Sequence, residues 1–205
     1  MKRFLGLILF LICSMPIYSQ SSRLGINLDI LTGNEYLTYE IGPSLVFDYH
    51  FANTPFAISG KTSFHLSEFS NGNNFSTGYT RTVFNVGAII NYYPISGAIE
   101  PYLGLGVFYN SNNISKSGTP SMSGPGIMLS PSNIKNNFSE EINFGINFSA
   151  NSPINFVVEV SQTFNKPDYH LNITEMKDVS YYTVTRDETF NFNSLFLRLG
   201  LYFKI

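Results

Sequence analysis

The sequence predicts an all-β fold, an eight-stranded antiparallel up-and-down transmembrane β-barrel. Three observations predict this fold: apolar and polar residues alternate with a period of two, charges are few, and short connections alternate with long ones. Charged residues make up 13% of the chain and aromatic residues 16%, whereas a soluble domain usually has about 25% charged residues. No continuous apolar run outside the N-terminal segment is long enough for a membrane helix. The apolar surface must therefore be distributed by alternation along strands.

The clearest alternation lies at the C-terminus, in residues 192–205. Successive side chains of a strand point to opposite faces, so residues of one parity share a face. One face is wholly apolar and comprises Leu195, Leu197, Leu199, Leu201, Phe203 and Ile205. The other face comprises Phe196, Arg198, Gly200, Tyr202 and Lys204. In membrane barrels, lipid-facing residues alternate with polar lumen-facing ones in this way, over segments of about ten residues.

The N-terminus has the layout of a secretory signal peptide, which we expect to span residues 1–19. Lys2 and Arg3 precede an apolar run over 4–13, and cleavage after Ser19 would leave Gln20 as the mature terminus. The run is too short for a membrane helix, which needs about 20 residues. The barrel domain is then expected to span 20–205.

Removal of this segment excludes several functions of the mature chain. The only cysteine is Cys13, which lies within the segment and follows Ile12, whereas a lipidation site requires a small residue there. A disulfide framework and a thiol nucleophile are therefore excluded. The segment also holds two of the twelve Lys and Arg residues and none of the fourteen Asp and Glu. The remaining acidic excess argues against nucleic-acid binding, which requires a basic face.

The first four expected strands span 24–30, 39–51, 56–66 and 79–93. In the first, Leu and Ile alternate with Gly, Asn and Asp, and the second alternates apolar rings and aliphatics with polar residues. Pro43 is unusual within the second, because proline is tolerated mainly at edges and bulges.

The last four expected strands span 101–109, 141–150, 154–164 and 195–205. The first of these places glycines on the parity of Tyr102, so that large inward rings can lie over glycine backbone in a narrow lumen. The other three alternate Ile, Phe, Val and Leu with polar residues and glycine. No helix and no cofactor or metal site is expected.

The connections separate the two ends of the expected barrel. Short connections follow strands two, four and six, and long ones follow strands one, three, five and seven. The long ones include 110–137, which has no period and is expected to be a loop, and 165–189, where alternation around 181–185 could extend a hairpin beyond the bilayer. In outer-membrane barrels short turns are periplasmic and long loops extracellular, so both termini are expected in the periplasm.

The outward aromatic residues are expected to form two girdles at the membrane interfaces. The girdle near the short turns comprises Tyr49, Phe51, Phe56, Tyr92, Phe148, Phe156 and Phe203. The girdle near the long loops comprises Tyr39, Phe64, Phe84, Tyr109 and Phe164.

The final residues, from Arg198 to Ile205, resemble the C-terminal signal that the barrel-assembly machinery reads. Gly200, Phe203 and Ile205 carry this resemblance, although Ile205 departs from the usual terminal aromatic residue. With the layout of eight strands, the chain resembles the small outer-membrane-protein β-barrel domain family of Gram-negative bacteria. The resemblance implies an outer-membrane location and contact with membrane lipid and lipopolysaccharide, and it supplies no catalytic residues to carry over.

Several functions remain open. The interior of an eight-stranded barrel is just wide enough for side chains to fill it, which disfavours a narrow, porin-like channel. His65 and Ser67 are similar to the His-x-Ser pair of lipid A deacylase barrels, so a lipid A-modifying enzyme is a second alternative. A lipocalin-like barrel would have the opposite polarity, with its apolar face inside. A structural or surface-binding role through the long loops is favoured, with an unknown extracellular ligand. The loop aromatics either form an adhesion or ligand surface or rest on lipid headgroups; they are Phe69, Phe75, Tyr169, Tyr181 and Tyr182.

Charged residues on the inward parity are expected to pair in the lumen, because an unpaired buried ion is costly. Asp29, Glu159 and Arg198 lie at similar heights on neighbouring strands, so we expect Arg198 to lie between the two carboxylates. Asp48 is expected to meet Lys61 across the hairpin of strands two and three. The alternative is that these side chains are separately hydrated. The pairs would plug the lumen and leave recognition to the loops.

Overall fold

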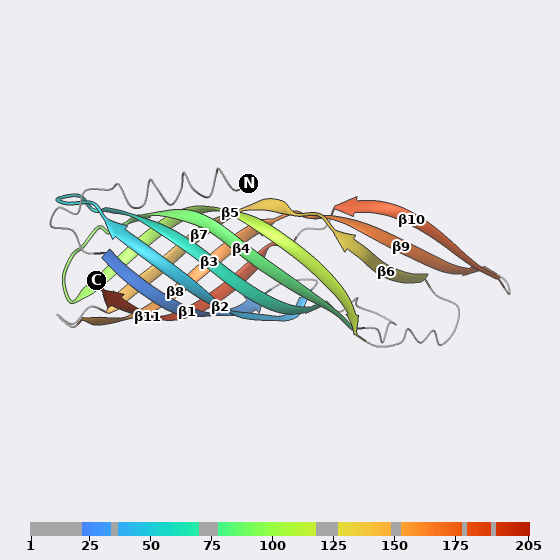
Figure 1. Cartoon of the computed structure of the whole chain (residues 1–205), viewed down its shortest axis with the longest axis horizontal. Coiled ribbons are helices and arrows are strands. Elements are labelled where there is room, and N and C mark those ends of the chain that lie inside the picture. Colours follow the sequence, from blue (N-terminus) through green and yellow to red (C-terminus); the bar gives the residue numbers. More distant parts are fainter. Residues whose placement is uncertain are drawn as a thin grey trace.

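The computed structural model describes residues 22–33, 37–69, 78–117, 127–148, 153–177, 180–189 and 192–205. The expected signal peptide and Cys13 lie outside these residues. Eight strands close into a barrel (Figure 1), in the order β1, β11, β8, β7, β5, β4, β3, β2. They are β1 (Ser22–Gly33), β2 (Leu37–His50), β3 (Phe56–Phe69), β4 (Gly78–Tyr92), β5 (Ile99–Ser117), β7 (Asn137–Phe148), β8 (Ile154–Asn165) and β11 (Ser194–Lys204).

The barrel closes through the antiparallel pair of its first and last strands. Leu28 of β1 lies opposite Leu199 of β11, and Asp29 lies opposite Arg198. All neighbouring barrel strands are antiparallel. Closure pairs the backbone amide and carbonyl groups of every strand, as a lipid environment requires. The prediction of an eight-stranded antiparallel barrel is confirmed.

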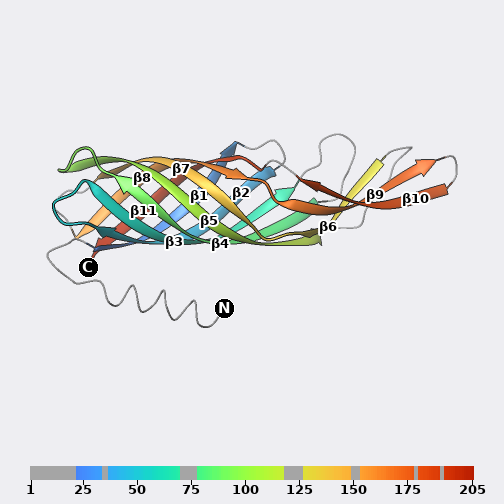
Figure 2. The same cartoon turned by 90° about the horizontal axis from the view of Figure 1, so that it is seen from above.

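Three further strands form a separate sheet in the order β10, β9, β6. They are β6 (Ile127–Ile134), β9 (Asp168–Lys177) and β10 (Ser180–Thr189). Figures 1 and 2 both show this sheet projecting beyond the barrel at the end opposite the C-terminus. The hairpin expected around 181–185 is present as β9 and β10. The expectation of a loop over 110–137 is wrong, because β5 continues to Ser117 and β6 pairs with β9.

The connections differ in length between the two ends, with one exception. Residues 51–55, 93–98 and 149–153 join strands at the end that holds the C-terminus, which we call the short-turn end. At the other end, 70–77 join β3 to β4, while the connections after β5 and β8 contain the strands of the extra sheet. The expected long connection after the first strand is wrong, because only residues 34–36 separate β1 from β2.

Pro43 lies inside β2, and the strand accommodates it by leaving one of its two pairings interrupted at this position. It pairs with Leu28 of β1, but the pairing of β2 with β3 skips Gly42 and Pro43 and resumes in the same register beyond them. Proline has no backbone N–H to donate to this ladder. The strand continues because the other neighbour still pairs with it.

The two faces of the barrel are inverted relative to a soluble protein. Outward residues such as Leu105 and Ile90 are 65% and 60% exposed, whereas the inward Asp29 and Arg198 are 0% and 3% exposed. An apolar outer wall around a polar interior is the arrangement of a transmembrane barrel. The lipocalin-like alternative is therefore wrong. Among the described residues, no helix is long and apolar enough to span a membrane.

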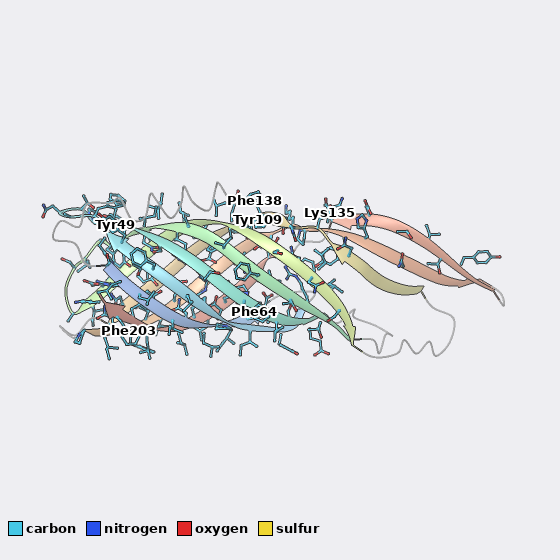
Figure 3. The ribbon with its side chains drawn as sticks, viewed as in Figure 1. Tyr49, Phe64, Tyr109, Lys135, Phe138 and Phe203 are labelled. Atoms are coloured by element: carbon cyan, nitrogen blue, oxygen red, sulfur yellow. The ribbon has the colours of Figure 1, made fainter. Side chains whose placement is uncertain are left out.

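Aromatic residues mark both borders of the apolar wall (Figure 3). Tyr49 and Phe203 lie near the short-turn end. Phe64, Tyr109 and Phe138 lie at a similar distance further along the barrel axis, with Lys135 beyond them. Phe138 is not among the expected girdle residues, and its ring contacts Tyr109 edge to face at 5.4 Å between centroids. Glu140 also faces outward on β7, two residues nearer the short-turn end than Phe138.

Candidate functional site

The centre of the lumen is an ion-pair network around Arg198 of β11. Its Nη1 donates to Glu141 Oε1 at 2.6 Å and to Glu159 Oε1 at 2.5 Å, and its Nη2 donates to Glu141 Oε2 at 2.6 Å. Its Nε lies 3.1 Å from Asp29 Oδ2. The contact with Glu141 is bidentate, the geometry in which guanidinium and carboxylate bind most strongly. Arg198 thereby links its own strand, β11, to β1, β7 and β8 across the interior.

Asp29 of β1 is the second hub of the network. Its Oδ2 lies 3.1 Å from Lys61 Nζ and 3.1 Å from His65 Nε2, and its Oδ1 accepts a hydrogen bond from Ser44 Oγ at 3.0 Å. Each of these residues projects inward because it lies on the polar parity of its strand. A carboxylate with several donors is tolerated at full burial, whereas an isolated one is not.

The structure brings together the three residues that the sequence places at similar heights, Arg198, Asp29 and Glu159. Alternation and strand order are sufficient to place them, because they lie on adjacent strands β1, β11 and β8. Glu141 is an additional partner that the sequence reasoning missed. It lies on β7, one strand further from β11, and reaches Arg198 only because both side chains extend into the lumen. The sequence did place Glu141 on the inward side of its strand, and this was the signal that could have identified it as a lumen residue.

The expected pair of Asp48 and Lys61 is wrong, because the register places them on different rungs. Asp48 lies opposite Ser59, and Lys61 lies opposite Val46. Lys61 therefore reaches across β2 to Asp29 of β1. Asp48 is buried at 4% exposure and has no Lys, Arg or His nitrogen within 4.0 Å among the described residues.

His65 and Ser67 do not form a nucleophile and base. His65 Nδ1 lies 3.0 Å from Glu40 Oε1, and its Nε2 lies 3.1 Å from Asp29 Oδ2. Both ring nitrogens therefore face carboxylates, which can only accept hydrogen bonds, and neither is directed at the serine hydroxyl. Ser67 is fully buried and donates to the backbone carbonyl of Arg81 at 3.4 Å. The two side chains contact other lumen groups and do not have the mutual geometry of a nucleophile and its base.

Side chains fill the space on both sides of the Arg198 network. A cavity of about 20 Å³ lies toward the short-turn end, and one of about 30 Å³ lies toward the extra sheet. A single water requires roughly 10–15 Å³ by this kind of measure, so each cavity has room for one or two waters. The lumen is therefore a packed core with two small gaps.

The end of the lumen beneath the extra sheet is capped. Arg81 lies 3.8 Å from Glu40 through Nη1 and Oε2, and its guanidinium carbon lies 5.1 Å from the centre of the Phe192 ring. Tyr169 stacks on Phe192 with centroids 5.3 Å apart and is only 1% exposed. Tyr169 is therefore part of a buried cap, and its expected role as a loop aromatic on the surface is wrong. Tyr182 is 58% exposed, while Phe75 lies outside the described residues.

The short-turn end is closed by a different pair. Arg23 Nη2 donates to Glu100 Oε2 at 2.9 Å, and Asn147 Nδ2 donates to the same oxygen at 2.8 Å. Outside this pair lies an open pocket of about 380 Å³ between the turns that precede β3 and β5. Tyr93 lines both this pocket and the small inner cavity.

Comparisons with solved structures show what this architecture resembles. The structure is similar to the outer membrane protein OprG from Pseudomonas aeruginosa, with a TM-score of 0.67 and 13% identity over 91% of this chain and 95% of that one. It is also similar to Neisserial surface protein A, with a TM-score of 0.54 and 11% identity over 92% and 98% of the two chains. For the outer membrane protein AlkL the TM-score is 0.51 and the identity 12%, over 94% and 93%.

The chain has the fold of the eight-stranded outer-membrane β-barrels. No protein-family model and no curated protein matches the sequence.

In this barrel the three residues of the expected assembly signal lie on β11 or just after it. Gly200 faces the lumen, where a Cβ atom would lie 1.9 Å from Asn27 Oδ1. Phe203 faces outward in the girdle of the short-turn end (Figure 3), and the backbone N–H of Ile205 donates to Ser22 O at 3.0 Å. The signal residues thus lie at the seam where β11 meets β1.

Proposed function

We propose that the protein resides in the outer membrane of a Gram-negative bacterium and has a structural or surface-binding role without catalysis. Its short-turn end and both termini face the periplasm, and the sheet of β6, β9 and β10 is extracellular. Membrane lipid and lipopolysaccharide surround the apolar wall, and the barrel-assembly machinery inserts the chain. The packed, ion-paired lumen is the observation that carries the proposal.

The same lumen argues against a narrow channel. Arg198 and its three carboxylates span the interior, and the gaps on either side have room for only one or two waters each. An ion would have to break these buried pairs in order to pass, and each broken pair costs several kcal/mol.

A lipid A-modifying enzyme would need its chemistry where lipid can reach it. His65 and Ser67 both face the lumen and are 3% and 0% exposed. The outer wall at this height presents Phe64 and Leu66 instead. The barrel wall therefore separates the pair from any acyl chain.

The extra sheet supplies the surface for recognition. Tyr182 and Val184 of β10 are 58% and 61% exposed, well beyond the membrane girdle. Exposed aromatic and apolar side chains in a projecting sheet suit the binding of a further molecule. The sheet of β6, β9 and β10 would then bind an extracellular molecule through these exposed side chains.

Surface labelling tests the orientation. Cys13 is the only cysteine and lies in the expected signal peptide, so one introduced cysteine is unique in the mature protein. On intact cells, a membrane-impermeant maleimide should label Tyr182→Cys, and it should label Ser96→Cys in the β4–β5 turn only after permeabilisation. The opposite labelling pattern would reverse the orientation.

Two further measurements test the closed lumen and the separate role of the sheet. The purified protein should give no steady current in planar bilayers, and a steady current would reject the closed lumen. Deletion of residues 172–185 should leave the heat-modifiable gel migration of the folded barrel unchanged. Loss of barrel assembly would instead make the hairpin part of the folding core.

A further inference from the structure

We propose that one edge of the projecting sheet pairs with the same edge of a second copy of this chain in a facing membrane. The edge is strand β10, which neighbours only β9 in the order of the described strands. The backbone N–H and C=O groups along an edge strand are a template for another β-strand. The inference deepens the surface-binding role proposed above and rests on the extracellular placement of this sheet.

The two edges of the sheet differ in how well they can accept a further strand. Strand β6 forms the other edge and contains Pro131, and its pairing with β9 shifts register between Pro131 and Asn133. Prolines and bulges block pairing at an edge. Strand β10 has no proline, and its ladder with β9 runs without a shift from Ser180 to Thr189. The edge that can accept a partner strand is therefore β10.

The outer half of β10 also lacks the charges that normally protect an exposed edge. Lysine and other charged side chains discourage edge-to-edge pairing. Residues 180–185, the half that follows the turn from β9, carry no charge. Tyr182 and Val184 in this half are 58% and 61% exposed, and tyrosine, threonine and valine are favoured in strands. This half of β10 is thus suited to lie between two strands.

Pairing of the same edge on two copies can only be antiparallel. In a parallel pair the two strands contribute opposite edges, whereas two copies of β10 both offer the same one. A twofold axis perpendicular to the sheet relates such copies and closes the assembly at two. Strands β9 and β10 run lengthwise, away from the barrel and back (Figures 1 and 2). Antiparallel copies of β10 therefore point their barrels in opposite directions, and the partner must lie in a facing membrane.

A register centred on Val184 makes this self-pairing complementary. Opposite residues must share a face of the sheet, and a register centred on one residue meets this condition. The opposed positions are Val184 with Val184, Thr183 with Thr185, Tyr182 with Arg186, Tyr181 with Asp187 and Ser180 with Glu188. No like charges are opposed, and apolar, threonine and aromatic pairs of this kind stabilise antiparallel sheets. This match between the two halves of β10 favours a second copy over an unrelated strand.

The test places one copy of the mature protein in each lipid nanodisc and follows pairing of the discs by analytical ultracentrifugation. Wild type should form paired discs. Val184→Lys opposes two like charges at the centre of the contact and should weaken pairing about tenfold. Asn133→Lys adds the same charge at an exposed position of the β6 edge and should leave pairing unchanged.

A nanodisc leaves both sides of the membrane accessible, so this result does not depend on the orientation of the protein in the cell. A reversed orientation would appear only in the maleimide labelling described above. Heat-modifiable gel migration shows whether each variant is folded.

An introduced cysteine tests the register directly. Val184→Cys would lie opposite its own counterpart, with the two Cα atoms about 4.5–5.5 Å apart, which is within the range of a disulfide. It should give a disulfide-linked pair under oxidising conditions. Tyr182→Cys replaces a similarly exposed residue, but it would lie about 13 Å along the strand from its counterpart and should remain single.

Each outcome decides the proposal. Paired discs that Val184→Lys weakens and Asn133→Lys does not, together with a disulfide in Val184→Cys alone, support it. Single discs of wild type overturn it and leave the edge to an extended segment of another protein. Equal pairing of wild type and Val184→Lys, or equal disulfide yields from the two cysteine variants, also overturns it, because the contact would then lie elsewhere.

Discussion

Replacement of Arg198 by alanine should strongly destabilise the barrel without opening it. Arg198 is the cation shared by Asp29, Glu141 and Glu159. After Arg198→Ala, Asp29 still contacts Lys61 and His65, and Glu159 still accepts a hydrogen bond from Tyr102 at 2.7 Å. Glu141 loses both of its contacts with the guanidinium. The main cost therefore falls on one buried carboxylate without a cation.

The size of the effect follows from this count of lost partners. Removal of one member of a buried ion pair costs about 3–5 kcal/mol, because the other charge stays buried and unpaired. The void left by the arginine side chain adds to the cost. We expect a loss in the free energy of unfolding at the upper end of this range. Equilibrium urea unfolding in micelles, followed by tyrosine fluorescence, measures it.

A double-mutant cycle isolates the contact with Glu141. Glu141→Gln removes the carboxylate charge, so Arg198→Ala should cost less in that background, by about 1–3 kcal/mol. Arg198→Ala should show no steady conductance in planar bilayers, because the other ion pairs and the caps remain. A total loss below about 1 kcal/mol, or strict additivity in the cycle, would refute the reasoning.

Three further predictions concern the wall, the backbone and the assembly signal. Leu105→Arg places a charge on the outer wall midway between the girdles and should reduce the free energy of folding into vesicles by about 2–4 kcal/mol. Ile99→Arg, near the short-turn end, should reduce it by only about 0–1 kcal/mol. Equal costs would contradict the membrane position of the wall. Gly42→Ala should reduce the refolded yield, because its Cβ would lie 1.9 Å from a β3 carbonyl oxygen, while Gly60→Ala meets nothing within 4 Å and should refold normally. Phe203→Ala should lower the heat-modifiable fraction in the outer membrane of cells but leave refolding in micelles intact, and loss in both would point to stability instead of assembly.

The sequence alone determined the barrel, its strand faces and most of its aromatic borders. Strand periodicity is local, so alternation in residues such as Leu199 and Arg198 was sufficient to separate lipid side from lumen side. The same reasoning placed Arg198 between Asp29 and Glu159, because the chain order makes β11 the neighbour of both β1 and β8.

Strands without clear alternation escaped the sequence reasoning. β6 carries Pro131 and Ser residues among its apolar ones, and its pairing with β9 shifts register between Pro131 and Asn133. A strand of this kind exists because β9 offers it a partner, which is a long-range property. The short connection between β1 and β2 was missed for a related reason, since both strands continue beyond the alternating core.

Which charges meet inside the lumen was decided only by the tertiary structure. Lys61 and Asp48 lie on adjacent strands with the correct parity, yet a register offset of two residues directs Lys61 to Asp29 instead. Glu141 reaches Arg198 from a strand that is not its neighbour. Alternation fixes the face on which a side chain lies, but register and long side chains crossing a narrow lumen fix its partners, and both depend on how the whole sheet closes.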